Sequence, residues 1–221
     1  MTSVVKAALV DVWQTILYGN FTERVAILAD YAGVDPDAWI ASWLRDAVER
    51  DRGKISIADS FAQTLRACGV EPTPGLVADL TRMDEEGMRE YVRLYDDTVP
   101  FFTSLRDQGI AIAIVSNCSE STRPLLEHLG VIPLADAVIL SCEVGSAKPS
   151  PEIYVTAIEE LGVAAADAVF IDDNHGFCVG AEAVGVRAIQ IARPDADGPF
   201  ASITSSAFPV VTSFLEVPPL L

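Results

Sequence analysis

The sequence predicts an α/β fold: a Rossmann-like parallel sheet with helices on both faces, plus an inserted helical bundle. Three observations predict it. Short, almost entirely apolar runs recur along the chain, as is typical of strands covered on both faces. Segments of helical periodicity separate these runs, and such strand–helix alternation builds a parallel sheet. A stretch from about residue 20 to 94 has helical spacing throughout and lacks strand-like runs.

Five β-rich runs are the expected strands, at residues 7–11, 110–116, 137–141, 168–172 and 186–191. The helices expected between them cover residues 100–108, 121–129, 151–161 and 176–184. A glycine follows each of these helices, namely Gly109, Gly130, Gly162 and Gly185. Glycine is the usual residue just past a helix C-terminus, so these positions support the predicted helix ends.

We expect two domains. Residues 1–18 and 96–221 form the Rossmann-like core, and residues 19–95 form a helical cap domain, with hinge segments at Gly19-Asn20 and 96–98. The cap should pack its own core from apolar residues at helical spacing: Leu28, Tyr31, Trp39, Trp43, Phe61, Leu65, Leu76, Leu80 and Met83. The apolar tail 214–221 is expected to pack on its own domain or on a neighbouring molecule.

The charge of the chain narrows the partners. Its 221 residues include 15 Lys and Arg against 32 Asp and Glu, a formal charge of −17. Such a surface repels nucleic acids and anionic membranes, so we expect neither as partner. We find neither an apolar run of membrane-spanning length nor a secretion signal, and four separated cysteines fit a reducing compartment. We expect a cytoplasmic protein, either a monomer or a homodimer.

Polar residues follow the expected strands at the edge where parallel sheets bind ligands. Asp11 ends the first run, Ser116-Asn117 the second, and Asp172-Asp173-Asn174 the fourth, while Lys148 lies in a proline-rich loop. A carboxylate can act as a nucleophile, and two carboxylates from separate strands can hold Mg²⁺. Lysine and hydroxyl groups can stabilise charge on a transferred group. The set predicts a site for a small anionic substrate.

These segments, in this order, resemble the haloacid dehalogenase superfamily of hydrolases over nearly the whole chain, from Lys6 to about Ile191. The four motifs of that family correspond to DVWQT at Asp11–Thr15, Ser116-Asn117, KPSPEIY at Lys148–Tyr154, and Asp172-Asp173, with a later G-A-x-x-x-G at Gly180–Gly185. The resemblance implies a hydrolase with a Rossmann-like core and a helical cap between the first two motifs.

The resemblance also implies roles for individual residues. The implied catalytic residues are Asp11 as the nucleophile, with Ser116 and Lys148 binding the phosphoryl group or a substrate carboxylate. The implied Mg²⁺ ligands are Asp11, Asp173 and the backbone carbonyl of Trp13, with Asp172 as a further ligand or as a partner of Lys148. The expected substrate-binding residues are Trp13, Thr15, Asn117 and Asn174.

Trp13 departs from the pattern of the family's phosphatases, which have an Asp that protonates the leaving alcohol. Trp cannot transfer a proton, and losing a positioned general acid costs about 10²–10⁴-fold in rate. Gln14 also stands where Gly is usual. Haloacid dehalogenases have Tyr at the position of Trp13, because halide leaves without a proton. The acid pair Asp172-Asp173 instead suits Mg²⁺, and Phe177 stands where dehalogenases have an Asp.

Three functions stay open. We favour a Mg²⁺-dependent phosphatase of low or specialised activity that cleaves a small phosphomonoester through an aspartyl-phosphate, with His175 as a candidate substitute acid. The alternatives are a 2-haloacid dehalogenase-like hydrolase, and a non-catalytic homologue that binds a ligand or partner. Trp13 and Tyr18 are candidates for an apolar wall beside the nucleophile. A cation of the basic run Arg45–Lys54 is a candidate to reach an anionic substrate across the cleft, but a solvated helix end is the commoner explanation of such a run.

Overall fold

The computed structural model describes residues 5–197 and 207–221. Its main sheet has six parallel strands in the order β5-β4-β1-β6-β7-β8. The strands are β1 (Ala7–Val10), β4 (Ala111–Ser116), β5 (Ala137–Leu140), β6 (Ala168–Asp172), β7 (Arg187–Ile191) and β8 (Val210–Val211). The predicted parallel α/β sheet is therefore confirmed. Residues 1–4 and 198–206 of the predicted core lie outside the described residues.

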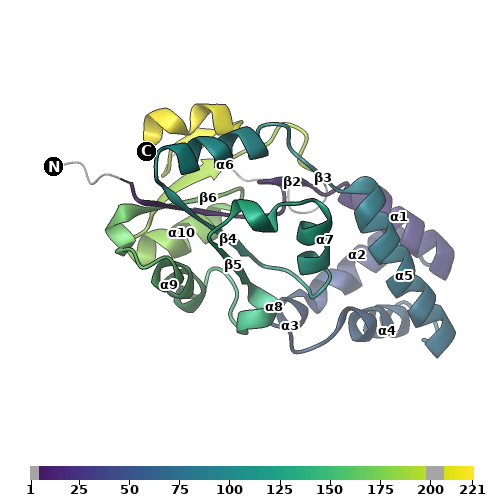
Figure 1. Ribbon diagram of the computed structural model, residues 1–221. Coiled ribbons are helices and arrows are strands. Elements are labelled where there is room, and N and C mark those ends of the chain that lie inside the picture. Colours follow the sequence, from purple (N-terminus) through teal and green to yellow (C-terminus); the bar gives the residue numbers. More distant parts are fainter. Residues whose placement is uncertain (1–4, 198–206) are drawn as a thin grey trace.

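Helices cover both faces of the sheet. Figure 1 shows α6 (Thr98–Asp107) and the C-terminal segment above the sheet, with α9 (Pro151–Glu160) and α10 (His175–Ala183) below it. The four residues of β1 explain the arrangement, because strand side chains alternate between faces. Ala8 and Val10 join the core that contains α6 and α7 (Thr122–His128), and Ala7 and Leu9 join the core with α9 and α10. A strand buried on both sides has to be apolar throughout.

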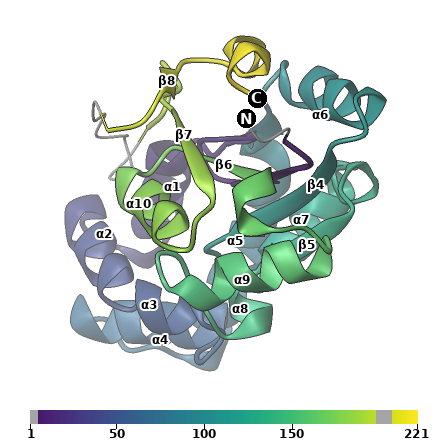
Figure 2. The same cartoon turned by 90° about the vertical axis from the view of Figure 1, so that its left-hand side faces the viewer.

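Five cap helices lie between β2 (Leu17–Tyr18) and β3 (Arg93–Leu94), two short strands that pair antiparallel. The helices are α1 (Phe21–Ala32), α2 (Pro36–Arg45), α3 (Ala47–Asp51), α4 (Ile57–Ala67) and α5 (Pro74–Tyr91). They pack side by side at one end of the sheet (Figures 1 and 2). Because β2 and β3 pair, the chain enters and leaves the cap helices at one place.

The cap helices bury a core of their own. Trp39, Phe61, Leu65 and Leu80 are fully or almost fully buried there, and the rings of Trp43 and Phe61 lie 5.1 Å apart. The expectation for Tyr31 is wrong, since its side chain is 49% exposed and its hydroxyl donates to Asp79. A position at helical spacing near the edge of the apolar stripe can face solvent, and a Tyr hydroxyl satisfied at the surface is stable there.

Local sequence also defines several helix ends. Asp35, Ser56 and Thr73 accept hydrogen bonds at the N-termini of α2, α4 and α5, and Ser56 forms a reciprocal capping box with Asp59. The four glycines predicted to follow helices all adopt positive φ, between 66° and 85°. None of the helices in the described ranges combines the length and apolarity needed to cross a lipid bilayer.

Short elements escaped the sequence analysis. Neither the two-residue strands β2, β3 and β8 nor the helix α8 (Ser141–Val144) was expected, because so few residues carry no periodic signal.

The C-terminal tail packs on its own domain, which was one of the two expectations for it. Phe214 and Val217 are buried against the sheet, and Phe214 stacks on Phe101 with ring centroids 4.4 Å apart.

A buried guanidinium joins three distant segments of the core. Arg193 forms a two-pronged ion pair with Asp97 at 2.7 and 2.8 Å, and two of its nitrogens donate to the Thr15 carbonyl at 2.9 and 3.1 Å. Asp97 also accepts from the amide of Phe214. The loop after β1, the start of α6 and the C-terminal tail therefore share one hydrogen-bonded centre.

We expect Arg193→Met to lower the free energy of unfolding by about 3–5 kcal/mol, because it leaves Asp97, whose side chain is only 13% exposed, without a cation. Urea unfolding followed by circular dichroism measures the change. The matched control is Arg123→Met, which removes an ion pair with Glu143 whose side chains are 35% and 40% exposed. That pair should contribute less than about 1 kcal/mol. Equal losses in the two variants would contradict the assigned role of Arg193.

Candidate active site

The carboxyl ends of three neighbouring strands bring predicted residues to one edge of the sheet. Asp11 follows β1 directly, Ser116 is the last residue of β4, and Asp172 is the last residue of β6. The strands pair in register, and the amide of Asp11 donates to the Ile171 carbonyl at 3.0 Å. The parallel register therefore determines which polar residues can meet at this edge.

Lys148 links two of these strand ends. Its ammonium Nζ lies 2.5 Å from Asp11 Oδ1 and 2.6 Å from Asp172 Oδ2, and its side chain is wholly buried. Burial alone would lower the pKa of Lys148, but the attraction of Asp11 and Asp172 outweighs it and raises the pKa above its ordinary value. Lys148 is therefore a permanent cation between two carboxylates.

The backbone of Lys148 is held by Asn117. The side-chain amide of Asn117 donates to the Lys148 carbonyl at 2.8 Å, and its Oδ1 accepts from the Lys148 amide at 2.7 Å. This amide pair mimics a strand hydrogen-bond ladder and joins the second motif to the third. Asn117, predicted as a substrate-binding residue, thus also positions the lysine.

Three carboxylates gather around this lysine. Asp11, Asp172 and Asp173 are all buried and offer oxygen atoms within 4.8 Å of one another. Asp172 directs Oδ2 to Lys148 and Oδ1 to the amide of Asn174, at 2.7 Å. Burial raises the pKa of Asp172 to about 7, although Lys148 opposes the shift. Even with Asp172 partly protonated, Asp11, Asp173 and Asp172 together carry more negative charge than one lysine balances, so the cluster favours a further cation.

The loop after β1 presents Trp13 to the site. The amides of residues 15, 16 and 17 all donate back to the Val12 carbonyl, and Gln14 adopts a left-handed conformation with φ 56°. This conformation accounts for the glycine that is usual at this position, since few residues with a Cβ adopt it. Gln14 is held there by contacts of its side chain with Asp197 and Tyr95.

A cavity of about 320 Å³ opens between the sheet edge and the cap helices. Five predicted site residues line it: Asp11, Trp13, Asn117, Asp173 and Asn174. Four others lie behind its wall, fully or almost fully buried: Thr15, Ser116, Lys148 and Asp172. The structure therefore brings the predicted residues into two layers, one that faces the cavity and one that supports it.

The cap wall of the cavity was largely missed by sequence reasoning. Its residues are Phe21, Arg24, Trp43, Ala47, Arg50, Asp51, Ile57, Asp84 and Met88. The basic run at 45–54 was the one available signal, but its reading as a solvated helix end is wrong for Arg50, which is buried and lines the cavity. These residues come from all five cap helices, so local spacing could not assemble them.

Two expectations about neighbouring residues do not hold. Tyr18 is not part of the cavity wall, because its ring packs at right angles near Tyr95 and beneath Arg93. His175 does not line the cavity either, and its ring lies 5.3 Å from that of Phe208. The N-cap of α10 is Asn174, whose side chain accepts from two backbone amides.

Comparison with known proteins agrees with this architecture. Residues 5–185 match the family of haloacid dehalogenase-like hydrolases. The glyceraldehyde 3-phosphate phosphatase of Methanopyrus kandleri is 30% identical over 135 residues, which are 60% of this chain and 58% of that protein. The (S)-2-haloacid dehalogenase of Xanthobacter autotrophicus is 29% identical over 178 residues, 78% of this chain and 66% of that protein.

A solved structure shares the fold. The crystal structure of a HAD phosphatase from Thermococcus onnurineus matches with a TM-score of 0.69 and 23% identity, over 98% of this chain and 97% of that one. The parallel sheet with its inserted cap helices and acidic strand ends thus defines a Rossmann-like hydrolase. The chain belongs to the haloacid dehalogenase superfamily, which confirms the resemblance seen in its motifs.

Gly180 in α10 explains part of the later G-A-x-x-x-G pattern. A Cβ at this position would lie 2.8 Å from Pro149 Cβ and 2.8 Å from the Tyr154 hydroxyl. Tyr154 itself donates to the Phe177 carbonyl at 2.7 Å, which ties α9 to α10. The absence of a side chain at Gly180 therefore lets α10 approach the loop that carries Lys148.

We expect Gly180→Ala to lower the free energy of unfolding by about 1–3 kcal/mol, because the added methyl group overpacks the contact with Pro149. Gly87→Ala is the matched control within α5, where a Cβ would meet nothing closer than 3.8 Å. There the same change should stabilise the protein by about 0.5–1 kcal/mol through helix propensity. Urea titration of both variants tests the pair, and stabilisation by Gly180→Ala would refute the close approach.

Proposed function

We propose that this hydrolase is a Mg²⁺-dependent phosphatase that cleaves a small phosphomonoester through an aspartyl-phosphate on Asp11. The observation that carries the proposal is the cluster of Asp11, Asp172 and Asp173 around the single cation of Lys148. Its excess negative charge suits a divalent cation and a phosphoryl group together, whereas a carboxylate substrate without a metal would be repelled. The phosphatase among the relatives supports the same choice. We further propose residues 19–95 as the domain that selects the substrate.

The donors of the cluster fit Mg²⁺, because all are oxygens of the hard type that this ion prefers. Asp172 already uses both oxygens, on Lys148 and on the Asn174 amide. We therefore assign the metal to Asp11, Asp173 and the backbone carbonyl of Trp13, with Asp172 holding the lysine. When bound, Mg²⁺ would reduce the repulsion between the nucleophile and the phosphoryl oxygens.

Asp11 supplies the nucleophile in this mechanism. Its Oδ1 accepts from Lys148 and keeps a lone pair that could bind the metal, so Oδ2 is the oxygen assigned to attack phosphorus. The new P–O bond forms as the ester P–O bond breaks, and the leaving oxygen departs with the electron pair. Water then attacks the phosphorus of the aspartyl-phosphate, and the bond between phosphorus and the Asp11 oxygen breaks. The proton lost by the water passes to solvent, phosphate leaves, and the Asp11 carboxylate is regenerated. Lys148 and Ser116 do not line the cavity, and we assign them to stabilise the negative charge of the phosphoryl oxygens from behind its wall.

Trp13 limits the rate of the first step. Its indole lines the cavity at the position where the family's phosphatases have a proton donor, and it cannot protonate an alkoxide. An alkyl leaving group therefore has to take its proton from water or from the substrate itself. We expect alkyl esters to react slowly, and esters with acidic leaving groups to be much less affected.

The aromatic residue at position 13 favours a second candidate, a dehalogenase-like hydrolase that acts at carbon. Halide departs without a proton, and a relative named (S)-2-haloacid dehalogenase covers 78% of this chain. Asp11 would then attack carbon, displace halide and form an ester that water hydrolyses. The acidic pair at Asp172-Asp173 is the feature that places this candidate second.

We expect wild-type protein to release phosphate from 4-nitrophenyl phosphate with millimolar Mg²⁺, and to lose this activity in EDTA or with Asp11→Asn. The measurement is the rate of nitrophenolate formation, with restoration by added Mg²⁺ as control. Halide release from 2-chloropropionate that survives EDTA would replace the phosphatase by the dehalogenase candidate. Absence of both reactions would support a non-catalytic homologue.

We expect Trp13→Asp to raise kcat for an alkyl phosphate by about 10²–10⁴-fold, because it introduces the missing acid. Turnover of 4-nitrophenyl phosphate should change far less, since its leaving group needs no proton. Trp13→Asn is the control, as it makes the same space without a transferable proton. Equal gains with Asp and Asn would show that the bulk of Trp13, rather than missing acid catalysis, limits the rate.

A further inference from the structure

The cavity has two chemically different walls. The sheet edge contributes the carboxylates of Asp11 and Asp173. The opposite wall contains one large apolar residue from each of four cap helices: Phe21 of α1, Trp43 of α2, Ile57 of α4 and Met88 of α5. Trp13 and Phe177 extend this apolar lining toward the core. A substrate whose reacting group meets the sheet edge would therefore direct its remaining part at an apolar surface.

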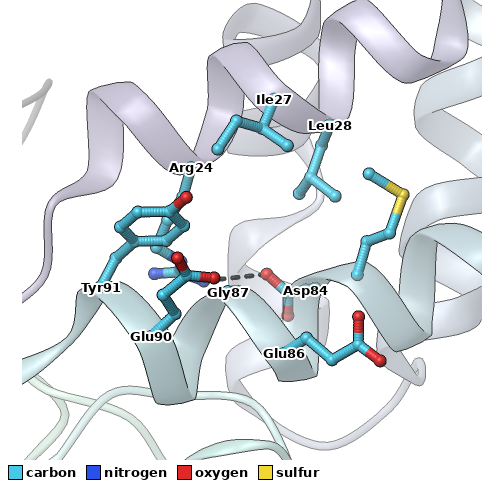
Figure 3. A pocket seen from close by; sticks show the side chains of 9 residues that line it. Arg24, Ile27, Leu28, Asp84, Glu86, Gly87, Glu90 and Tyr91 are labelled. Carbon is cyan, nitrogen blue, oxygen red and sulfur yellow. Dashed lines mark hydrogen bonds and ion pairs between the residues drawn. The ribbon is translucent and has the colours of Figure 1, made fainter.

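One of the two cations in the cap wall, Arg24, is already paired. Its Nη2 lies 2.8 Å from Asp84 Oδ1, and the two side chains are 12% and 6% exposed. Figure 3 shows this pair joining α1 to α5, seen from a neighbouring cavity of about 150 Å³ that both residues also line. The Nε of Arg24 is buried with no acceptor among the described residues. With its charge matched by Asp84, this group suits a neutral oxygen acceptor.

The other cation, Arg50, is used to hold three cap helices together. Its Nη1 donates to the Trp43 carbonyl at 3.1 Å and to the Ser60 hydroxyl at 3.0 Å, and its Nε lies 3.9 Å from Asp51. Its guanidinium also lies 3.9 Å above the Trp43 ring. All these partners of Arg50 lie within the cap. The guanidinium therefore stabilises the cap wall and is not available to pair with a ligand.

The charges of the cap wall balance without a substrate. Arg24 and Arg50 face Asp84 and Asp51, so the four groups sum to zero. The charge of every Lys and Arg that lines the cavity within the described residues is thus matched by a carboxylate, although the Nε of Arg24 keeps a free donor for a neutral acceptor. Residues 1–4 and 198–206 contain no Lys, Arg or His. A second anionic group on the substrate would lie near the carboxylates of Asp51 and Asp84 in the cap wall and would find no unpaired cation there. Placing such a group in a partly buried site is unfavourable.

We propose that the substrate is a phosphomonoester whose organic group is uncharged and apolar, of about the size of one aromatic ring. The proposal rests on the phosphatase function and names the substrate class of that site. The cavity volume of about 320 Å³ agrees with a small ester, since ligand sites span roughly 300–1,000 Å³. The aromatic and aliphatic side chains of the cap wall supply the hydrophobic contact, and the phosphoryl group carries the negative charge.

Three synthetic esters test the proposal: methyl phosphate, benzyl phosphate and 4-carboxybenzyl phosphate, each with wild-type protein and Mg²⁺. Their leaving alcohols have similar acidity, so the chemical step is matched and the comparison reports on the organic group. We expect kcat/KM for benzyl phosphate to exceed that for methyl phosphate by about tenfold or more, because burying a ring is favourable. The carboxylate should reduce kcat/KM at least about tenfold relative to benzyl phosphate.

Asp51→Asn tests the electrostatic basis with little change of shape. The substitution leaves the positive charge of Arg50 partly unbalanced. The ratio of kcat/KM for benzyl phosphate to kcat/KM for 4-carboxybenzyl phosphate should therefore fall at least threefold. A purely structural role of Asp51 would lower both rates and leave their ratio unchanged. The matched control is Glu49→Gln on the same helix, because Glu49 is exposed and does not line the cavity. The kcat/KM ratio of the two esters for Glu49→Gln should equal the ratio for the wild type.

The outcomes separate this inference from the function on which it rests. If wild-type protein cleaves none of the three esters and no 4-nitrophenyl phosphate, the phosphatase function fails and the substrate class falls with it. If it cleaves them but accepts the carboxylate ester as well as the benzyl ester, the phosphatase function stands and the substrate class is refuted. An unchanged ratio in Asp51→Asn would refute the assigned role of the wall charges.

Discussion

The structure depends on one buried ammonium group. The carboxyl ends of β1 and β6 each carry an acid, and without a cation Asp11 and Asp172 could not be buried side by side. Lys148 makes that juxtaposition stable by bonding to both at 2.5 and 2.6 Å. Several features far apart in the sequence serve the placement of this lysine. The side chain of Asn117 hydrogen-bonds to the backbone of Lys148. Because Gly180 has no side chain, α10 can lie close to the loop that carries Lys148.

The cap helices complete the site without adding net charge to it. The two cap arginines that line the cavity, Arg24 and Arg50, pair with groups of the cap itself, so large apolar side chains of the cap lie opposite the acidic sheet edge. Contacts from the core hold this surface in place. Asp197 accepts hydrogen bonds from the first two amides of α1, and Glu120 accepts from the first amide of α4. The apolar wall and the acidic edge of the cavity thus come from different parts of the chain.

Trp13 illustrates this separation within a single loop. The turn after β1 is formed by backbone bonds to the Val12 carbonyl and by the left-handed Gln14, and neither requires a particular side chain at position 13. The fold therefore tolerates an indole where other members of the superfamily have a proton donor. With the proposed nucleophile Asp11, Lys148 and the acid pair in place, the substitution would change the proton transfer and not the rest of the site. Members that share this architecture can differ in reaction for that reason.

The sequence by itself determined the parallel sheet, the long helices and the identity of the acidic strand ends, because apolar periodicity and helix caps are local signals. It also indicated that Asp11, Lys148 and the acid pair belong together, through motifs whose order matches the superfamily. It did not reveal the cap wall or the two-residue strands, and it misjudged Tyr31, Tyr18 and Arg50. Tertiary structure alone decided which residues face the cavity and which support it from behind, and which cations are already paired. Those outcomes depend on contacts between residues tens of positions apart, for which spacing along the chain carries no signal.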